Sequence, residues 1–262
     1  MAVPIPQSAG EWAGLIIGGL IAPLFGLGSL LRRDRVFHPR GICFFARVTP
    51  AETIPDLQPL ARRLTGTALV RLAAGASRKN HWGMPDVLGF SIRFGVRPPE
   101  DLFHEDTQDL LTASARTLWT LLPDSLRTQR GSFMANRYYG MTVFEIDGQR
   151  DCLIAIQPLE PDGDGEDRFQ RIRNAAAAGH ARFSLQVARS GQVEWHPVAI
   201  IELLEEEVID EDKDLMFTPF NAQLGIRPQG FIHFLRYFPY LASWLGRKLA
   251  MRLGTREAYS IP

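Results

Sequence analysis

Short apolar runs bracketed by turn-forming residues recur along most of the sequence and constrain its fold more than any other feature. Seven of them have the length of β-strands, and several alternate apolar with polar residues. An Asp147-Gly148 pair separates two of the runs, which predicts a tight hairpin. The runs are GICFFARV (41–48), ALVRLAA (68–74), VLGFSIRFGV (87–96), MTVFEI (141–146), CLIAIQPL (152–159), ARFSLQVA (181–188) and HPVAIIELL (196–204).

Three further segments have the spacing of apolar residues that is typical of helices. They cover residues 106–126, 166–181 and 230–253, and Gly179 closes the helix expected in the second of them. In the last segment Pro239 predicts that a new helix begins there, because proline is favoured in the first turn. Antiparallel strands followed by C-terminal helices predict an α+β fold, with a β-barrel or a strongly curved sheet.

The N-terminal segment is apolar and uncharged from Ala13 to Leu31, a run of nineteen residues. A signal peptide would have basic residues before such a run and a small-residue cleavage site after it, and this segment has neither. Its length approaches that of a membrane span, although Pro23 and five glycines disfavour a straight helix. We therefore expect residues 1–31 to attach the protein to a membrane, by shallow insertion or a single span. A hairpin buried against the protein or a partner is the alternative.

If the segment spans the membrane, the basic residues Arg32, Arg33 and Arg35 predict that the domain of residues 32–262 lies on the cytoplasmic side. The whole chain has 29 basic and 29 acidic residues, so no net field favours nucleic acid as a partner. Cys43 and Cys152 lie in apolar runs, which indicates buried thiols in a reducing compartment. The histidines lack the spacing of a zinc site. The oligomeric state stays open, a homo-oligomer included.

Arg236, Tyr240 and Arg247 have the spacing of one helical face in the C-terminal segment. Two guanidinium groups beside a phenol favour its ionised form, and a phenolate is a good ligand for a hard ferric ion. The alternative interpretation is that Arg236 extends into solvent and Tyr240 is an aromatic residue at the rim of the core.

Two stretches far apart in the chain resemble the haem-contacting segments of catalases. RVFHPRG (35–41) resembles their distal segment R-V-V-H-A-K-G, and RYFPY (236–240) resembles their proximal segment R-L-F-S-Y, whose tyrosine ligates the iron. Weaker resemblances occur between them in the order of the family. These are VRLAAG (70–75), DVLGFSIRF (86–94), DLFHEDT (101–107) and YYGMTVFEIDG (138–148).

The resemblance runs from about residue 32 to residue 250 and implies a catalase-like antiparallel β-barrel that binds haem b. It implies that Tyr240 ligates the iron and that Arg236 keeps this tyrosine ionised. It also implies that His38 is the distal acid-base residue. The resemblance further implies that the haem propionates are bound by three arginines, Arg35, Arg71 and Arg247.

Three departures from the family pattern bear on the reaction. Glu105 occupies the place of the distal asparagine, and a carboxylate there could act as a second acid-base group. Ala73 replaces a serine that supports the histidine, and Phe37 replaces a smaller residue. The chain thus more closely resembles the small catalase-like proteins, which include allene oxide synthase and minimal catalase-related peroxidases.

These observations lead to the expectation of a haem-dependent oxidoreductase that acts on peroxide. A peroxidase or peroxygenase that uses organic peroxides, above all lipid peroxides, or an apolar co-substrate agrees best with the apolar N-terminal segment and with Glu105. Two alternatives remain. One is a small true catalase that dismutates hydrogen peroxide, and the other is a protein that binds or senses haem without turnover.

Overall fold

The computed structural model describes residues 5–32, 40–75, 85–97, 106–207 and 215–252. Its elements are α1 (Ala9–Arg32), β1 (Arg40–Pro50), η1 (Pro55–Leu57), α2 (Gln58–Arg63), β2 (Gly66–Ala74), β3 (Leu88–Phe94), β4 (Gln108–Ala113), α3 (Leu121–Arg127), β5 (Tyr138–Tyr139), β6 (Phe144–Ile146), β7 (Gln149–Pro158), α4 (Arg168–Ala177), β8 (Arg182–Arg189), β9 (His196–Glu207), β10 (Ile226–Pro228) and α5 (Phe231–Arg252).

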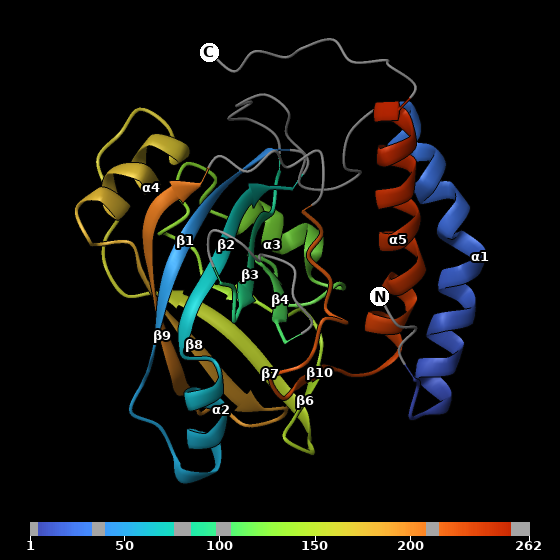
Figure 1. Cartoon of the computed structure of the whole chain (residues 1–262), viewed down its shortest axis with the longest axis horizontal. Coiled ribbons are helices and arrows are strands. Elements are labelled where there is room, and N and C mark those ends of the chain that lie inside the picture. Colours follow the sequence, from blue (N-terminus) through green and yellow to red (C-terminus); the bar gives the residue numbers. More distant parts are fainter. Residues whose placement is uncertain (1–4, 33–39, 76–84, 98–105, 208–214, 253–262) are drawn as a thin grey trace.

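A closed antiparallel barrel forms the centre of the molecule (Figure 1). Its strands in the described part of the chain follow the order β7-β5-β4-β3-β2-β1-β9-β8, and β8 pairs again with β7. The short strands β6 and β10 continue the sheet beyond β7. The predicted α+β fold with an antiparallel barrel is thus confirmed, and closure leaves the barrel strands without free edges.

Aromatic and branched side chains fill the interior of the barrel. Phe90 in β3 packs against Tyr138 and Phe183, with ring centroids 5.5 and 5.0 Å apart. Because residues alternate along a strand, Val70 and Leu72 of β2 point into this core, whereas Leu69 and Arg71 point outward. The outward face of β1 to β4 has its own apolar layer, covered by residues 215–217.

The hairpin predicted at Asp147-Gly148 is confirmed. Both residues have positive φ, 49° and 82°, as a type I′ turn between β6 and β7 requires. The helix predicted over residues 166–181 is confirmed as α4, where the Asp167 carboxylate accepts hydrogen bonds from the Phe169 and Gln170 backbone and Gly179 has a φ of 72°.

The helix predicted over residues 106–126 is wrong for most of its length. Residues 108–113 form β4, and a helix covers only Leu121–Arg127. Strand β4 lies between β3 and β5 and is almost entirely buried, so its apolar residues do not alternate in the way that marks a half-exposed strand. Its polar residues have partners, for example the Thr112 hydroxyl donates to the Phe90 carbonyl at 2.8 Å.

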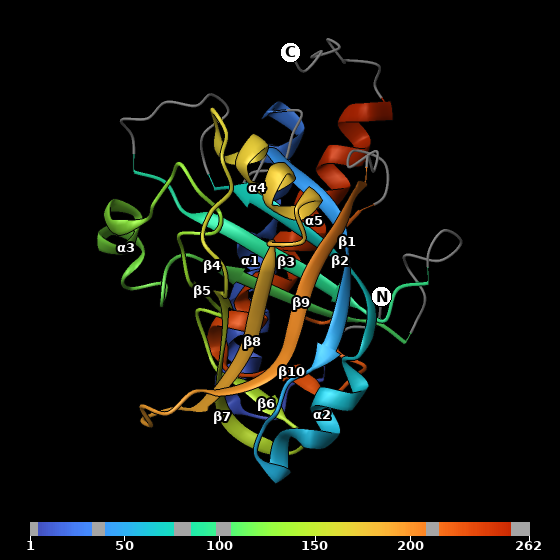
Figure 2. The same cartoon turned by 90° about the vertical axis from the view of Figure 1, so that its left-hand side faces the viewer.

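Helices α1 and α5 form a pair beside the barrel, as the two views agree (Figures 1 and 2). α1 is a single helix that continues through Pro23, so the hairpin considered for this segment does not form. The helices run parallel, since Gly14 and Gly18 approach Phe231 and Leu235, whereas Gly26 approaches Ala242. α5 lies between α1 and the barrel (Figure 1).

Candidate functional site

Arg236 and Tyr240 contact one another on α5, one helical turn apart. The Arg236 Nη2 donates a hydrogen bond to the Tyr240 hydroxyl, and the Arg236 Cζ lies 5.1 Å from the centroid of the tyrosine ring. Both residues are half-buried. The Arg236 guanidinium thus contacts the Tyr240 hydroxyl oxygen, which is the atom that would be ionised in a tyrosinate ligand.

α5 continues through Pro239 rather than beginning there, so the prediction of a new helix at Pro239 is wrong. A proline inside a helix leaves the carbonyl four residues before it without its usual donor. That carbonyl belongs to Leu235, and Gly18 of α1 lies against it. Helix α1 thus packs closely against α5 at the point where the proline interrupts the hydrogen bonds of that helix.

Arg71 lies on the outward face of β2 and is 3% exposed. Its guanidinium covers Gly41 of the neighbouring strand β1, where a Cβ would come within 2.5 Å of the Arg71 Cζ. A side chain at position 41 would therefore displace the Arg71 guanidinium from its present place. Ala73, two residues further on the same face, is buried and pairs with Gly41.

The segment of residues 215–221 connects the outward face of the barrel with α5. The Arg93 guanidinium binds Asp109 with two 2.7 Å contacts and donates to the Met216 carbonyl at 2.6 Å. Phe220 packs on the other side against Phe234 and Tyr237 of α5, with centroids 5.3 and 5.0 Å apart. The outward face of β3 and β4 and the start of α5 thus both pack against the segment of residues 215–221.

His233 is a buried residue of this region that no motif in the sequence marked as a site residue. It is 1% exposed and packs on the Phe144 ring at 4.7 Å, and neither ring nitrogen makes a hydrogen bond within the described residues. Burial, and secondarily the charge of Arg236, lower the pKa of His233 well below 6.5, against a smaller opposite effect of the Val143 backbone. Its position one helical turn before Arg236 is the feature of the sequence that could have marked His233 as part of this region.

The remaining predicted site residues cannot be placed with this pair. Arg35, His38 and Glu105 lie outside the described residues, as does Phe37. Arg247 lies in α5 two turns after Tyr240, and its side chain is not among those that the structure describes. The structure therefore brings Arg236 and Tyr240 together and places Arg71 on the outward face of β2. The roles of all the predicted site residues stay predictions.

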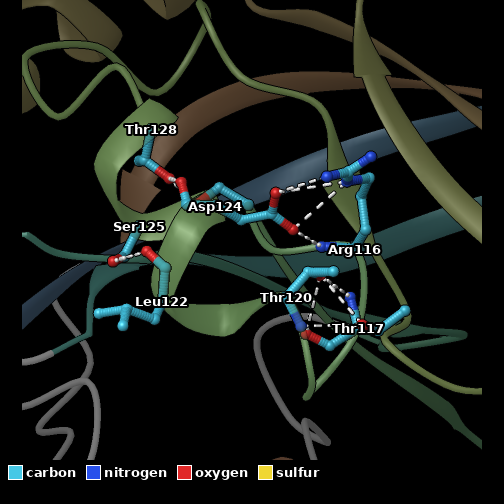
Figure 3. Close-up of polar contacts among 8 residues, drawn as sticks. Arg116, Thr117, Thr120, Leu122, Asp124, Ser125 and Thr128 are labelled. Atoms are coloured by element: carbon cyan, nitrogen blue, oxygen red, sulfur yellow. Dashed lines mark hydrogen bonds and ion pairs between the residues drawn. The ribbon is translucent and has the colours of Figure 1, made fainter.

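A separate polar pocket of about 320 Å³ is lined by residues of the segment 114–139, which includes α3 and β5. Figure 3 shows its main contact, in which the Arg116 backbone and guanidinium donate to the Asp124 carboxylate at 2.8 and 3.0 Å. Burial alone would raise the pKa of Asp124, but Arg116 and Thr120 lower it to about 2. With its carboxylate bound on both oxygens, Asp124 holds the loop before α3 rather than supplying an acid.

Among solved structures, a fungal catalase resembles this chain. The TM-score is 0.54 at 12% sequence identity, and the match covers 82% of this chain and 59% of that catalase. Searches against protein-family models and against curated proteins found no match. The chain therefore has a catalase-like fold, and it spans well under two thirds of the length of that fungal catalase.

Proposed function

We propose that this protein binds haem b through Tyr240 and uses it to react with organic peroxides. The observation that carries the proposal is the hydrogen bond from Arg236 to the Tyr240 hydroxyl, on a helix beside a barrel of catalase-like fold. A permanently charged guanidinium on that oxygen favours the tyrosinate that a ferric ion prefers. The donor set thus fits a tyrosine-ligated haem.

The buried Arg71 would receive one haem propionate, since a guanidinium matches a carboxylate with two parallel hydrogen bonds. By resemblance, Arg35 and Arg247 would also bind the two propionates. The haem, when bound, supplies the chemistry that cleaves the peroxide O–O bond. The role of the protein is to hold the haem, to keep Tyr240 ionised and to move protons.

Proton movement is assigned to His38 from the resemblance. An imidazole can take the proton from the near oxygen of a peroxide and return it to the departing oxygen at neutral pH. The alanine at position 73 supplies no hydroxyl to orient this imidazole. Glu105, in the place of an amide, accepts rather than donates hydrogen bonds when ionised. Both features favour a peroxidase or peroxygenase over efficient dismutation of hydrogen peroxide.

The test of the haem ligand compares Tyr240→Phe with Tyr237→Phe. Tyr237 lies on the same helix and is 2% exposed, so its substitution perturbs the fold at least as much. We expect the absorption spectrum of Tyr237→Phe to match that of the parent. Tyr240→Phe should lose haem or its charge-transfer bands, because the ligand oxygen is missing. Identical spectra for Tyr240→Phe and the parent would exclude Tyr240 as the ligand.

The reaction is tested with two peroxides and the haem-loaded protein. A fatty-acid hydroperoxide should disappear with little oxygen released, and hydrogen peroxide should be the poorer substrate. Rapid oxygen evolution from hydrogen peroxide would instead indicate a small true catalase. Stable haem binding without loss of either peroxide would indicate a haem-binding or haem-sensing protein.

A further inference from the structure

Helix α1 presents apolar side chains to the outside and its polar ones to the protein. The exposed side chains that form one stripe along the helix are Trp12, Ile16, Ile17, Leu20, Leu24, Leu27 and Leu31, each more than 40% exposed. We call them the outer stripe. Glu11 and Ser29 are fully buried instead. A helix on the surface of a water-soluble protein has the opposite arrangement.

The buried face of α1 consists largely of small residues. A Cβ at Gly14 or Gly18 would lie 2.3 or 2.4 Å from a carbonyl oxygen of α5, so the two backbones touch. The Ser29 and Ser243 hydroxyls form a hydrogen bond of 2.5 Å between the helices. Small residues and hydroxyls between helices, with aliphatic residues outside, are typical of helices surrounded by lipid.

The helix pair has more basic than acidic residues and, apart from Arg236, its basic residues lie at one end. α5 contains no acidic residue, and Glu11, the acidic residue of α1, is bound to Arg227 at 2.9 Å. Basic residues occur in the last turns of the two parallel helices, at positions 32, 247, 248 and 252. A basic end beside an aliphatic stripe is complementary to an anionic lipid surface. A surface that binds a protein partner would instead have a polar rim around the apolar stripe.

α1 is long and apolar enough to cross a membrane, with 23 residues from Ala9 to Leu31. Its attachment to the barrel argues against crossing. At its start, Glu11 binds Arg227 and accepts from the Gly230 backbone at 3.1 Å, and after its end only residues 33–39 precede β1. Both ends are thus tied to one barrel, and a crossing would draw the side of that barrel into the hydrocarbon.

We infer that α1 lies flat on an anionic membrane surface with its outer stripe inserted at the boundary of headgroups and acyl chains. The stripe is about 29 Å long at 1.5 Å per residue, so nearly the whole length of α1 would contact the membrane surface. α5, which carries Tyr240, lies directly behind it. The inference does not require the proposed function, since it rests on the outer stripe of α1 and the basic end of the helix pair and not on haem binding.

Vesicle sedimentation of the full chain tests the inference. The parent should bind phosphatidylcholine vesicles that contain 30% phosphatidylglycerol, a composition of roughly physiological anionic charge. The variant Ile16→Glu/Leu20→Glu/Leu24→Glu should bind roughly a hundredfold more weakly, because three inserted side chains become charged. Lys248→Glu should weaken binding to the anionic vesicles by about tenfold and leave neutral vesicles unaffected.

The control variant is Trp119→Glu/Leu122→Glu/Leu126→Glu near α3, where the side chains are 87%, 71% and 65% exposed. It introduces the same charges into an equally exposed apolar patch on another element. Its vesicle binding should equal that of the parent. Loss of binding in this control with retention in the stripe variant would overturn the inference, as would a parent that does not bind. Circular dichroism of each variant verifies folding.

Depth measurement separates a flat helix from a spanning one. Nitroxide labels on single cysteines at positions 16, 20, 24 and 31 report their depth in the bilayer, and the native Cys43 and Cys152 are buried. A flat helix places all four labels at one shallow depth. A maximum near the bilayer midplane at positions 20 and 24 would show a span and contradict the inference. A dimer in solution that the stripe variant dissociates would assign the stripe to a second copy instead.

Discussion

At the scale of single residues, the Arg236 guanidinium and the His233 imidazole lie one turn apart on α5 and differ in charge. Arg236 keeps its charge and directs it at the Tyr240 hydroxyl. His233, one turn earlier, is buried among apolar groups, so its neutral form is favoured. The same turn of helix thus holds a cation that binds the candidate ligand and an imidazole that must stay uncharged.

His233 should make the protein sensitive to acid. Its pKa in the folded state lies well below the value of 6.5 in the unfolded state, so the unfolded state binds an extra proton as the pH falls below 6.5. The free energy of unfolding should therefore fall by roughly 2 kcal/mol more in the parent than in His233→Leu between pH 7 and pH 5. Urea denaturation at these two pH values measures the difference.

The control is substitution of the exposed His180 by leucine, which should leave the pH dependence as in the parent. Parallel pH profiles for the parent and His233→Leu would show that this imidazole is protonated in the folded protein.

At the scale of elements, the contact between α1 and α5 depends on glycine at particular positions. Gly18 has no room for a side chain, because a Cβ would lie 2.4 Å from the Leu235 carbonyl oxygen. Gly19, the next residue, would place a Cβ 3.5 Å from the Phe238 ring, an ordinary contact. Neighbouring glycines of one helix thus differ in what they permit.

Gly18→Ala should destabilise the protein by about 1–3 kcal/mol, since the helices must move apart. Gly19→Ala should be neutral or stabilise it by up to about 1 kcal/mol, because alanine favours the helix. Chemical denaturation of both variants measures the effects. Equal effects of the two substitutions would contradict the close approach of the helices at Gly18.

At the scale of the whole molecule, the ion pair of Arg93 and Asp109 joins the barrel to the segment that covers it. The two side chains are 5% and 0% exposed, and Asp109 also accepts from the Thr218 backbone at 3.0 Å. Breaking such a pair leaves one charge buried without its partner, which is costlier than removing both.

Asp109→Ala should lower the free energy of unfolding by about 3–5 kcal/mol, because it leaves the Arg93 guanidinium buried without a carboxylate. The double variant Arg93→Met/Asp109→Leu should lose less, since no buried charge remains. Urea denaturation of the two variants provides the comparison. A double variant less stable than Asp109→Ala would show that the pair itself, rather than the cost of a lone charge, stabilises this region.

Local pattern determined the elements whose signals are short-range. Turn residues at Asp147-Gly148 and the cap at Asp167 specify a hairpin and a helix whatever surrounds them, and alternating strands indicate one buried face. The spacing of Arg236 and Tyr240 likewise determines their contact once the segment is helical. These features needed no knowledge of distant residues.

Tertiary structure decided what depends on distant neighbours. β4 is a strand because β3 pairs with it along its whole length, and Tyr139 and Ala222 pair with its two ends on the other side, although its apolar spacing looks helical. α5 remains one helix through Pro239, and Gly18 of α1 packs against the Leu235 carbonyl that the proline leaves without its helical donor. The apolar N-terminal segment has an inside and an outside only because α5 covers its glycine face, since a helix is amphipathic only relative to what it packs against.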